Sequence, residues 1–515
     1  MIPSFVLKRL YSQGSLETNA GGVRFALKNR LSDAVLTGLR RIQINGSEVP
    51  LHAVELEFTD GRRLPAELVS KENPVRFPLR EIVRVHAPGE IGAGKNHKIH
   101  LAFETSPFGQ VAFTVEDAAR TDTGPARKAE GIPGDRANDW APEMVAGRRR
   151  WLEERTGVRL EHLDKYSWEP ALAKGNCENL VGVAQVPVGL AGPLRIHGEH
   201  ARGEYLIPMA TTEGTLVASY NRGMKVLNLA GGVTCTVSDD RMQRAPVFVF
   251  RSAREARDFR DWVGRNMTSI REAAESTSSV ARLLDIDAYL SNAFAFLRFS
   301  FSTGDAAGQN MVGKATLAAC SWILSHVDSV VSFYLESNFA TDKKGSHVNM
   351  LRTRGKRVTA EATIPRAIVQ DHLHTEPETL HHQAQIATIG AYLSGASNNG
   401  AHSANGIAAM FIACGQDVAN VAESSAGIVY TDVTPAGDLY LSLTIPALIV
   451  ATHGGGTGLP TQRECLEILG CRGKGKASRF AEIVAGVALA GELSLGSAIA
   501  SFDWVTSHET LGRNR

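Results

Sequence analysis

The chain has 515 residues, 43% of them hydrophobic and 21% charged, and its formal net charge is +1. These values are ordinary for a soluble globular protein of two to four domains, and a charge so near zero gives no reason to expect nucleic acid or an anionic membrane as main partner. The six cysteines form no CxxC pair, and the N-terminal apolar run is too short for a signal peptide, so we expect free thiols and a cytoplasmic protein.

Residues 1–118 are predicted to form a small all-β domain. Short runs that alternate polar and apolar residues are separated by turns such as Asp60-Gly61, a pattern typical of a sandwich or barrel. Residues 89–96 match the GxxxxGK phosphate-loop pattern, but Asn96 stands where a Ser or Thr is needed and a strand follows, so we expect a hairpin turn. Residues 119–140 are rich in Gly and Pro and predict a linker.

Residues 141–176 are predicted to be mainly helical, with a helix over 144–156 and a second segment starting near Glu161. Residues 178–193 read as an extended stretch punctuated by Gly and Pro. The sequence MATTEG (209–214) opens a predicted helix that runs to about Leu229. Glu213 then lies in the first turn, where it either interacts with the helix dipole or serves as a general acid or base.

Residues 246–336 are predicted to follow the order β-α-β-β-α-β of a ferredoxin-like unit. The first helix is expected over about 253–275 and the second over about 306–326. This unit interrupts a larger region of alternating strands and helices, residues 177–245 and 337–515. The predicted fold class is therefore α+β, with a large mixed domain, an inserted ferredoxin-like domain and a preceding all-β domain.

Residues 401–421 are predicted to form a central buried helix of about six turns, because apolar residues surround it on every side. Five polar residues share an arc of roughly 120° on that helix: His402, Asn405, Gln416, Asp417 and Asn420. A buried carboxylate is costly unless it is paired, so a cation should face Asp417. Lys343, in the run Asp342-Lys343-Lys344, is a candidate for that cation, although such a run can also be a solvated charged loop.

Two glycine turns join strands to helices, at residues 304–310 and at 453–457, and both can approach a phosphate closely. Neither has the GxGxxG spacing of a Rossmann fold. The histidines at 372, 374, 381 and 382 do not fit a zinc motif. The apolar run 483–501 is broken by Glu492 and predicts a buried helix rather than a membrane span.

Taken together, these stretches closely resemble the 3-hydroxy-3-methylglutaryl-CoA (HMG-CoA) reductase family over residues from about 140 to 515. The resemblance rests on ENLVGVAQVPVGLAGP, MATTEG, STGDAAGQNM, TDKK, CGQDVANV, HGGGTGLP and a terminal SH, in the family's order. The triple glycine resembles the class I branch, whose members favour NADPH. The implied reaction uses two hydrides to convert HMG-CoA to mevalonate and coenzyme A, with no metal ion.

The resemblance also implies site residues. The implied catalytic residues are Glu213, Lys343, Asp417 and His508. The implied substrate-binding residues are Arg244, Asp342, Lys344, Asn405, Glu178 and Asn179. The implied cofactor-binding residues are Asp305, Ala306, Gly308, Asn310, Gly454, Gly455, Gly456 and Thr457. The family assembles its site between subunits, which implies a homodimer or a dimer of dimers, with neither nucleic acid nor membrane as partner.

The chain departs from the family pattern at Glu336, where a substrate-contacting serine is usual, and at Gln309 in the cofactor motif. Residues 1–118 have no counterpart that the motifs identify, so their role is open. Two alternatives therefore remain beside the main interpretation. One is a reductase of a related acyl-CoA, and the other is a non-catalytic CoA-binding or interaction protein.

Overall fold

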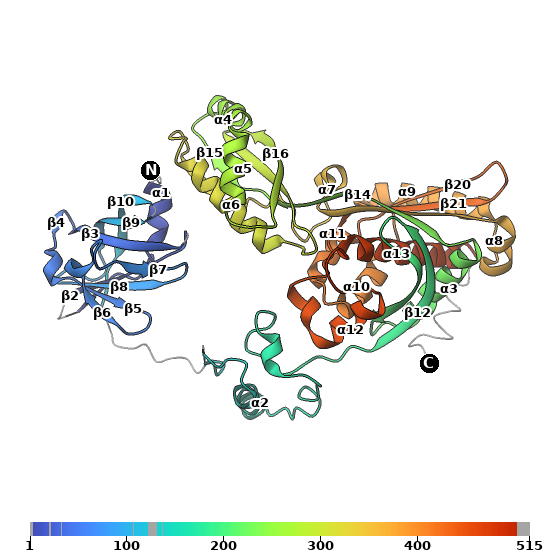
Figure 1. Ribbon diagram of the computed structural model, residues 1–515, viewed down its shortest axis with the longest axis horizontal. Coiled ribbons are helices and arrows are strands. Elements are labelled where there is room, and N and C mark those ends of the chain that lie inside the picture. The colour runs from blue at the N-terminus through green and yellow to red at the C-terminus, as the bar shows by residue number, and fades with distance from the viewer. Residues whose placement is uncertain are drawn as a thin grey trace.

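The computed structural model describes residues 4–19, 22–31, 33–106, 108–121, 131–135 and 137–501 (Figure 1). Its strands form two small sheets near the N-terminus and one long mixed sheet in the rest of the described chain. Helices pack on the long sheet, whereas the N-terminal part is almost entirely strands. This combination is the α+β class that the sequence predicts.

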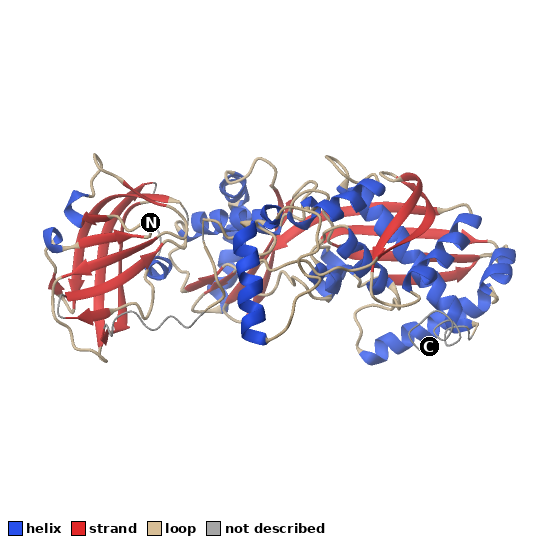
Figure 2. Cartoon of the chain, turned by 90° about the horizontal axis from the view of Figure 1, so that it is seen from below, coloured by secondary structure: helices blue, strands red, loops and turns tan. Residues whose placement is uncertain are grey.

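The two N-terminal sheets share one apolar core and form a sandwich, seen at one end of the molecule in Figure 2. The first sheet has the order β11-β1-β2-β8-β5-β6 and the second β10-β9-β3-β4, with β7 paired to β3. The strands are β1 (Glu17–Asn19), β2 (Gly22–Lys28), β3 (Ala34–Ile44), β4 (Ser47–Glu48), β5 (Glu55–Phe58), β6 (Arg63–Pro65), β7 (Val75–Phe77), β8 (Ile82–Ala87), β9 (Asn96–Ser106), β10 (Gly109–Ala118) and β11 (Arg120–Thr121). Short helices are α1 (Ser4–Leu7), η1 (Lys8–Leu10), η2 (Leu51–Ala53) and η3 (Ala66–Leu68).

Two details of this sandwich differ from the sequence expectation. Strand β3 is not among the strands that the alternating pattern predicts. Its pairing with β9 shifts register twice, near Gly38 and near Arg41, so its buried side chains do not follow a period of two. Residues 89–96 do not form a hairpin turn, since β8 and β9 belong to different sheets and the segment crosses between them. The strand that follows, β9, agrees with the exclusion of a phosphate loop.

After the sandwich come α2 (Pro142–Thr156) and η4 (Pro170–Ala173). The predicted helix over 144–156 is confirmed, but no helix starts at Glu161, where the chain makes isolated turns. The fully buried Arg148 fixes α2, because its guanidinium donates hydrogen bonds to the carbonyl oxygens of Pro133, Asp139 and Leu180. The predicted extended stretch over 178–193 starts instead with a bend, where Asn179 has a left-handed φ of 51°, and its residues from Val188 onward belong to β12 (Val188–Gly198).

The long sheet has ten strands in the described chain, with the main order β18-β15-β17-β14-β19-β21-β20. Its strands outside residues 246–336 are β12 (Val188–Gly198), β13 (Arg202–Ala210), β14 (Val233–Arg244), β19 (Gly355–Ile364), β20 (Ile428–Val433) and β21 (Leu439–Leu448). The helices there are α3 (Leu216–Leu229), α7 (His347–Arg352), α8 (Arg366–Leu373), α9 (Pro377–Ser394), α10 (Ser403–Ala413), η5 (Val418–Asn420), α11 (Val421–Ser424), η6 (Gly455–Gly458), α12 (Pro460–Ile468) and α13 (Ala477–Ala500).

Residues 246–336 contribute β18-β15-β17-β16 to the sheet, which is the strand order 4-1-3-2 of a ferredoxin-like unit. The elements are β15 (Val247–Val249), α4 (Ala253–Arg265), α5 (Met267–Glu275), β16 (Arg282–Ser291), β17 (Phe294–Ser302), α6 (Gln309–Leu324) and β18 (Ser332–Tyr334). The predicted helix over 253–275 is two helices, because Asn266 leaves helical geometry and bonds back to the carbonyl oxygen of Trp262. Strand β14 pairs first with β19 and then with β17, so one strand joins both parts (Figure 1).

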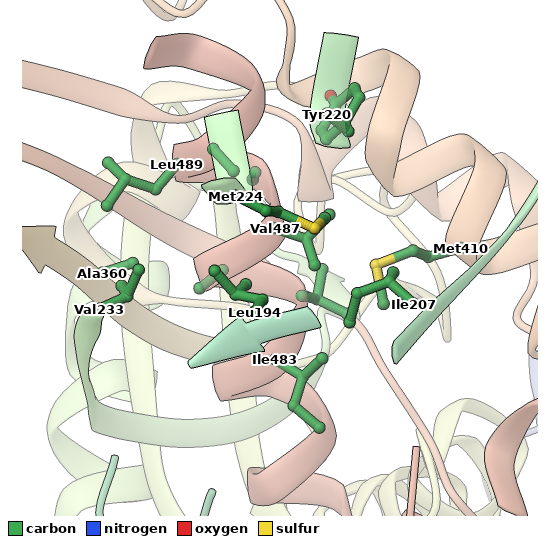
Figure 3. Packing of buried hydrophobic residues seen from close by; sticks show 14 of the residues in the cluster. Leu194, Ile207, Tyr220, Met224, Val233, Ala360, Met410, Ile483, Val487 and Leu489 are labelled. Atoms are coloured by element: carbon green, nitrogen blue, oxygen red, sulfur yellow. The ribbon is translucent and has the colours of Figure 1, made fainter. Parts of the chain in front are cut away.

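The predicted central helix over 401–421 is wrong in its extent. Helix α10 ends at Ala413, since Gly415 adopts a left-handed φ of 67° and turns the chain. The helix at the centre of the core is instead α13, whose Ile483, Val487 and Leu489 pack among residues of β12, β13, α3 and β19 (Figure 3). Helix α13 is the one described helix long and apolar enough to cross a membrane, and 78% of its most apolar window is buried inside the protein, as expected for a core helix.

Candidate functional site

Lys343 and Asp417 form an ion pair. The Nζ atom of Lys343 lies 3.0 Å from Oδ2 of Asp417. The hydrogen bond to Asp417 is the largest cause that raises the pKa of Lys343 above its ordinary value. The predicted pairing is therefore confirmed. The premise that Asp417 is a buried residue of a long helix is wrong, because the side chains of Lys343 and Asp417 are 43% and 51% exposed. Asp417 follows α10 and caps η5 by accepting the backbone N–H of Ala419.

A second charged group surrounds Asp342. Its carboxylate lies 2.7 Å from Nη2 of the buried Arg354 and 3.9 Å from Nη1 of Arg244. The Nζ atom of Lys344 donates hydrogen bonds to Oδ1 of Asn338 and to the carbonyl oxygen of Asp342. The structure thus brings together Arg244, Asp342 and Lys344, three residues that the family resemblance assigns to substrate binding.

The two departures from the family pattern also meet at Arg244. Its Nη1 atom lies 3.4 Å from the carboxylate of Glu336, and its Nη2 atom donates to the carbonyl oxygen of Gln309. The side chain of Gln309 in turn donates to Oδ1 of Asn420 in η5. Gln309 therefore links the start of α6 to the segment that carries Asp417.

Glu213 accepts a hydrogen bond of 3.1 Å from Nδ2 of Asn405, near the start of α10. The expectation that Glu213 lies in the first turn of a helix is wrong. Thr215 has a left-handed φ of 68°, which a helix cannot contain, so α3 begins only at Leu216 and Glu213 lies exposed in the preceding loop. Exposure leaves its carboxyl group free to meet a ligand.

The two glycine turns line one cavity of about 560 Å³, here called the glycine-loop cavity. Its wall is formed by residues 306–311 at the start of α6, by residues 453–457 before α12, and by the segment that includes Gln416 and Asp417. Seven of the eight residues expected to bind the cofactor are among the lining residues: Ala306, Gly308, Asn310, Gly454, Gly455, Gly456 and Thr457. Asp417 also lines the cavity, so the Lys343–Asp417 pair stands at its edge.

Asp305, the eighth residue, has another position. Its carboxylate accepts hydrogen bonds from the backbone N–H groups of Gly475, Lys476 and Ala477, at the start of α13. Burial alone would raise the pKa of Asp305, but these three donors outweigh burial and the pKa lies below its ordinary value. Asp305 therefore fixes the turn beside the cavity and is not among the lining residues.

The wall of the cavity depends on close backbone packing of Gly415 against Gly456. A Cβ atom at Gly415 would lie 2.3 Å from the carbonyl oxygen of Gly456. We expect Gly415→Ala to lower the free energy of unfolding by about 2–4 kcal/mol, from strain at positive φ together with this clash. Chemical denaturation measures the loss. Gly458→Ala is the control, because a Cβ there meets no atom within 4 Å; equal losses in both variants would contradict the packing argument.

Of the other polar residues of the predicted arc, Gln416 holds this wall, whereas His402 is not among the lining residues. Gln416 both donates to and accepts from the backbone of Ala451, at 3.0 and 2.8 Å, and so ties the Asp417 segment to the end of β21. His402 is buried beside Tyr220, with its Nε2 atom 3.2 Å from the hydroxyl of Ser219. Glu492 of α13 accepts the N–H groups that open α10.

Some predicted site residues lie elsewhere. Glu178 and Asn179 are exposed in a bend before β12, although the nearby Asn176 lines the glycine-loop cavity. His508 lies outside the described residues. Arg354 and Glu423 are fully buried beside the TDKK segment and were missed by sequence reasoning, because RTRGKR reads as a solvated charged run and Glu423 belongs to no motif that was recognised.

Comparisons with known proteins place the chain in a family. The family model described as "Hydroxymethylglutaryl-coenzyme A reductase" matches residues 144–513. A reductase of Pyrococcus abyssi is 45% identical over 374 residues, which cover 71% of this chain and 92% of the relative, and one of Methanothermobacter thermautotrophicus is 44% identical over 377 residues, with 72% and 94% coverage. Both relatives are named 3-hydroxy-3-methylglutaryl-coenzyme A reductase. The chain belongs to the HMG-CoA reductase family.

The comparisons correct one expectation. A second model, described as "Hydroxymethylglutaryl-CoA reductase, N-terminal domain", matches residues 6–120, so the sandwich does have a counterpart in the family. A solved structure of a class II reductase of Streptococcus pneumoniae is described as bound to NADPH in open conformations. Its alignment covers 69% of this chain and 97% of the S. pneumoniae chain. Its TM-score is 0.54 and its identity is 21%, so this likeness concerns the fold.

Proposed function

We propose that the protein reduces HMG-CoA to mevalonate and coenzyme A in two steps with NADPH. The observation that carries the proposal is the Lys343–Asp417 pair at the edge of a cavity lined by both glycine turns. Residues Gly308 and Gly454–Gly456 let the backbone approach a phosphate, and the free N–H groups at the start of α6 face the same region. These features fit a dinucleotide, which supplies hydride when it is bound.

The residues of the site can serve each proton and charge transfer of this reaction. Hydride addition to a thioester builds negative charge on the carbonyl oxygen, and the ammonium group of Lys343 stabilises that charge. Asp417 holds the ammonium group in place, and Glu213, oriented by Asn405, supplies a proton to the oxygen. Arg244 and Lys344 offer cationic groups to the substrate carboxylate. We assign protonation of the departing thiolate to His508 by resemblance alone.

We further propose that two subunits complete each site. Asn405 and Ala413 are separated by about 12 Å of helix, and no hydrogen bond or ion pair of the described residues joins the Glu213–Asn405 pair to the Lys343–Asp417 pair. A second copy can bring its Lys343–Asp417 pair to the Glu213–Asn405 pair of the first. Helix α9 supports such an assembly, because it exposes Ile386, Ile389, Tyr392 and Leu393 on the described surface.

The division of the chain follows from the same proposal. Residues 1–118 form the N-terminal domain, 119–140 the linker and 141–176 a helical extension. Residues 177–245 and 337–515 form the substrate domain, and 246–336 form the inserted dinucleotide-binding domain. The class I assignment and the cytoplasmic location belong to the proposal as well; the second is supported by six free cysteines, five of them buried.

Purified protein, HMG-CoA and NADPH test the proposal in one assay, in which absorbance follows NADPH oxidation. We expect turnover, with a higher kcat/KM for NADPH than for NADH. Absence of turnover would remove the proposed function, and a higher kcat/KM with NADH would remove the cofactor preference. Turnover unaffected by Lys343→Ala would contradict the assigned mechanism.

A reductase of a related acyl-CoA is the second candidate, and Glu336 favours it. A carboxylate 3.4 Å from Arg244 competes for the cation that would hold the substrate carboxylate. We expect Glu336→Ser to lower the KM for HMG-CoA by up to about 10-fold, because it frees Arg244. If the variant instead raises this KM, Glu336 contributes to binding of HMG-CoA itself, which counts against the second candidate.

The N-terminal domain should affect assembly rather than chemistry. It contacts the inserted unit through Arg9, whose guanidinium donates to the carbonyl oxygen of Phe333 and lies over the ring of Tyr334. We expect deletion of residues 1–118 to keep kcat within about 3-fold, since no residue assigned to the reaction lies there. Light scattering should report an altered oligomer mass, and an unchanged mass would remove the assembly role.

A further inference from the structure

Glu423, the third residue of α11, contacts the backbone of Lys343. Its side chain is fully buried, and its Oε1 atom accepts a hydrogen bond of 3.1 Å from the backbone N–H of Lys343. Its Oε2 atom has no hydrogen-bond partner among the described residues. Burying a carboxyl group with one unbonded oxygen costs free energy, so the presence of Glu423 beside Lys343 calls for an explanation.

The backbone of Lys343 is held in an unusual conformation. Lys343 has a φ of 58°, and Asn338 and Thr341 in the same segment have φ values of 68° and 56°. Each such conformation is strained for a residue with a side chain and persists only where its surroundings fix it. The bond from Lys343 to Glu423 supplies such a restraint at the residue whose ammonium group is assigned to the oxyanion.

Arg354 extends the restraint to Asp342. It is fully buried, with Nε 3.6 Å from Oε1 of Glu423 and Nη2 2.7 Å from Oδ1 of Asp342. Its Nη1 atom donates to the carbonyl oxygen of Gln243 in β14. Glu423 and Asp342 therefore share one guanidinium group, which ties α11 and the TDKK segment to the long sheet.

The chain order gives this contact a second consequence. Asp417 and Glu423 lie on one short segment, with η5 and the start of α11 between them. Asp417 holds the side chain of Lys343, and Glu423 holds its backbone. The segment from Asp417 to Glu423 thus contacts both the side chain and the backbone of Lys343.

We propose that Glu423 is a positioning residue for Lys343, acting through the backbone N–H bond and through Arg354. This inference rests on the proposed function for its kinetic consequence, and on the geometry alone for its effect on Lys343. The charge of Glu423 is also one of the causes that raise the pKa of Lys343, after the contributions of Asp417 and Asp342. Burial raises the pKa of Glu423 itself, while the N–H of Lys343 and Arg354 act in the opposite direction.

The kinetic test is a double-mutant cycle with Glu423→Ala and Lys343→Ala in the full-length protein. If Glu423 acts through Lys343, Glu423→Ala lowers kcat by about 100-fold in the wild type, as a small misplacement does, but by less than about 3-fold in the Lys343→Ala background. Glu423→Gln keeps an oxygen that can accept the N–H bond and should recover most of kcat. Equal losses in both backgrounds would contradict the proposal, because Glu423 would then act independently of Lys343.

Glu482→Ala is the matched control. Glu482 is also fully buried and also accepts backbone N–H bonds, from Glu199, His200 and Ala201, but at the turn between β12 and β13. We expect this variant to lose thermal stability without a change in kcat. A kcat loss equal to that of Glu423→Ala would show that any buried carboxylate has this effect, and would overturn the specific role.

A measurement without turnover separates this inference from the proposed function. The pH dependence of Lys343 acetylation by acetic anhydride, followed by peptide mass spectrometry, reports the pKa of its ammonium group. We expect a lower pKa and faster acetylation of Lys343 in folded Glu423→Ala, a smaller change in Glu423→Gln, which keeps an acceptor for the N–H bond, and no change in Glu482→Ala. An unchanged Lys343 profile in Glu423→Ala would overturn the positioning role even if HMG-CoA is reduced. A shifted profile with no HMG-CoA turnover would keep it and remove only the proposed reaction.

Discussion

Replacing Lys343 with alanine should lower kcat for HMG-CoA reduction by about 100- to 1,000-fold, the usual cost of losing one preorganised oxyanion donor. The ammonium group stands 3.0 Å from Asp417 at the edge of the glycine-loop cavity, and it is the cation best placed to meet charge that develops there. Steady-state kinetics with saturating NADPH measures the loss. The KM for HMG-CoA should change much less, because the charge on the carbonyl oxygen develops only in the transition state.

The control for this variant is Lys225→Ala. Lys225 is an exposed lysine on α3 and no mechanism assigns it a role, so its removal should leave kcat within about 2-fold. If Lys343→Ala keeps more than about a tenth of the wild-type kcat, the oxyanion assignment is wrong. A loss confined to KM would give Lys343 a binding role instead.

Asp417→Asn should lower kcat by about 100-fold and shift the alkaline limb of the pH profile to lower pH. The hydrogen bond to Asp417 is the largest cause that raises the pKa of Lys343. Its loss therefore lowers that pKa, and the ammonium form required for catalysis is lost at a lower pH. The pH dependence of kcat, measured from neutral to alkaline pH for both proteins, gives the direction of the shift.

The same pairing has a small effect on stability. A raised lysine pKa contributes stability that is fully present below the unfolded-state pKa and is lost as pH rises through the folded-state pKa. Since both partners are about half exposed, this contribution is weak.

The control for the Asp417→Asn kinetics is Asp258→Asn, which removes an equally exposed partner of Arg257 on α4 and should move neither kcat nor its pH profile. An alkaline limb that stays fixed or moves upward in Asp417→Asn would contradict the assigned pairing.

The Lys343–Asp417 pair shows how far charge arguments reach from sequence. The pairing of Asp417 with a lysine of the TDKK run was predicted correctly, but both premises of that prediction were wrong: Asp417 is about half exposed, and it does not lie on the predicted long helix. Gly415 ends α10 because its left-handed φ allows the close approach to Gly456, a contact between residues 41 positions apart in sequence. The local pattern of polar and apolar residues cannot predict a contact between residues so far apart in sequence.

The same limit explains the other differences. Alternating strands and the β-α-β-β-α-β order were predictable because they depend on local pattern, whereas β3 was missed since its two register shifts remove that pattern. Asp305 lies in a motif expected to bind the cofactor, yet its carboxylate bonds to the start of α13, 170 residues later. Arg354 and Glu423 look like surface charges in sequence, but both are fully buried and contact residues far away in sequence, Gln243 for Arg354 and Lys343 for Glu423.

Product stoichiometry tests the central proposal most directly. Purified protein is given a limiting, known amount of HMG-CoA with excess NADPH, and the NADPH oxidised, free thiol released and mevalonate formed are counted at completion. We expect two NADPH oxidised, one thiol released and one mevalonate formed for each HMG-CoA. Thiol release without NADPH oxidation, or one NADPH for each HMG-CoA with an aldehyde as the final product, would contradict it.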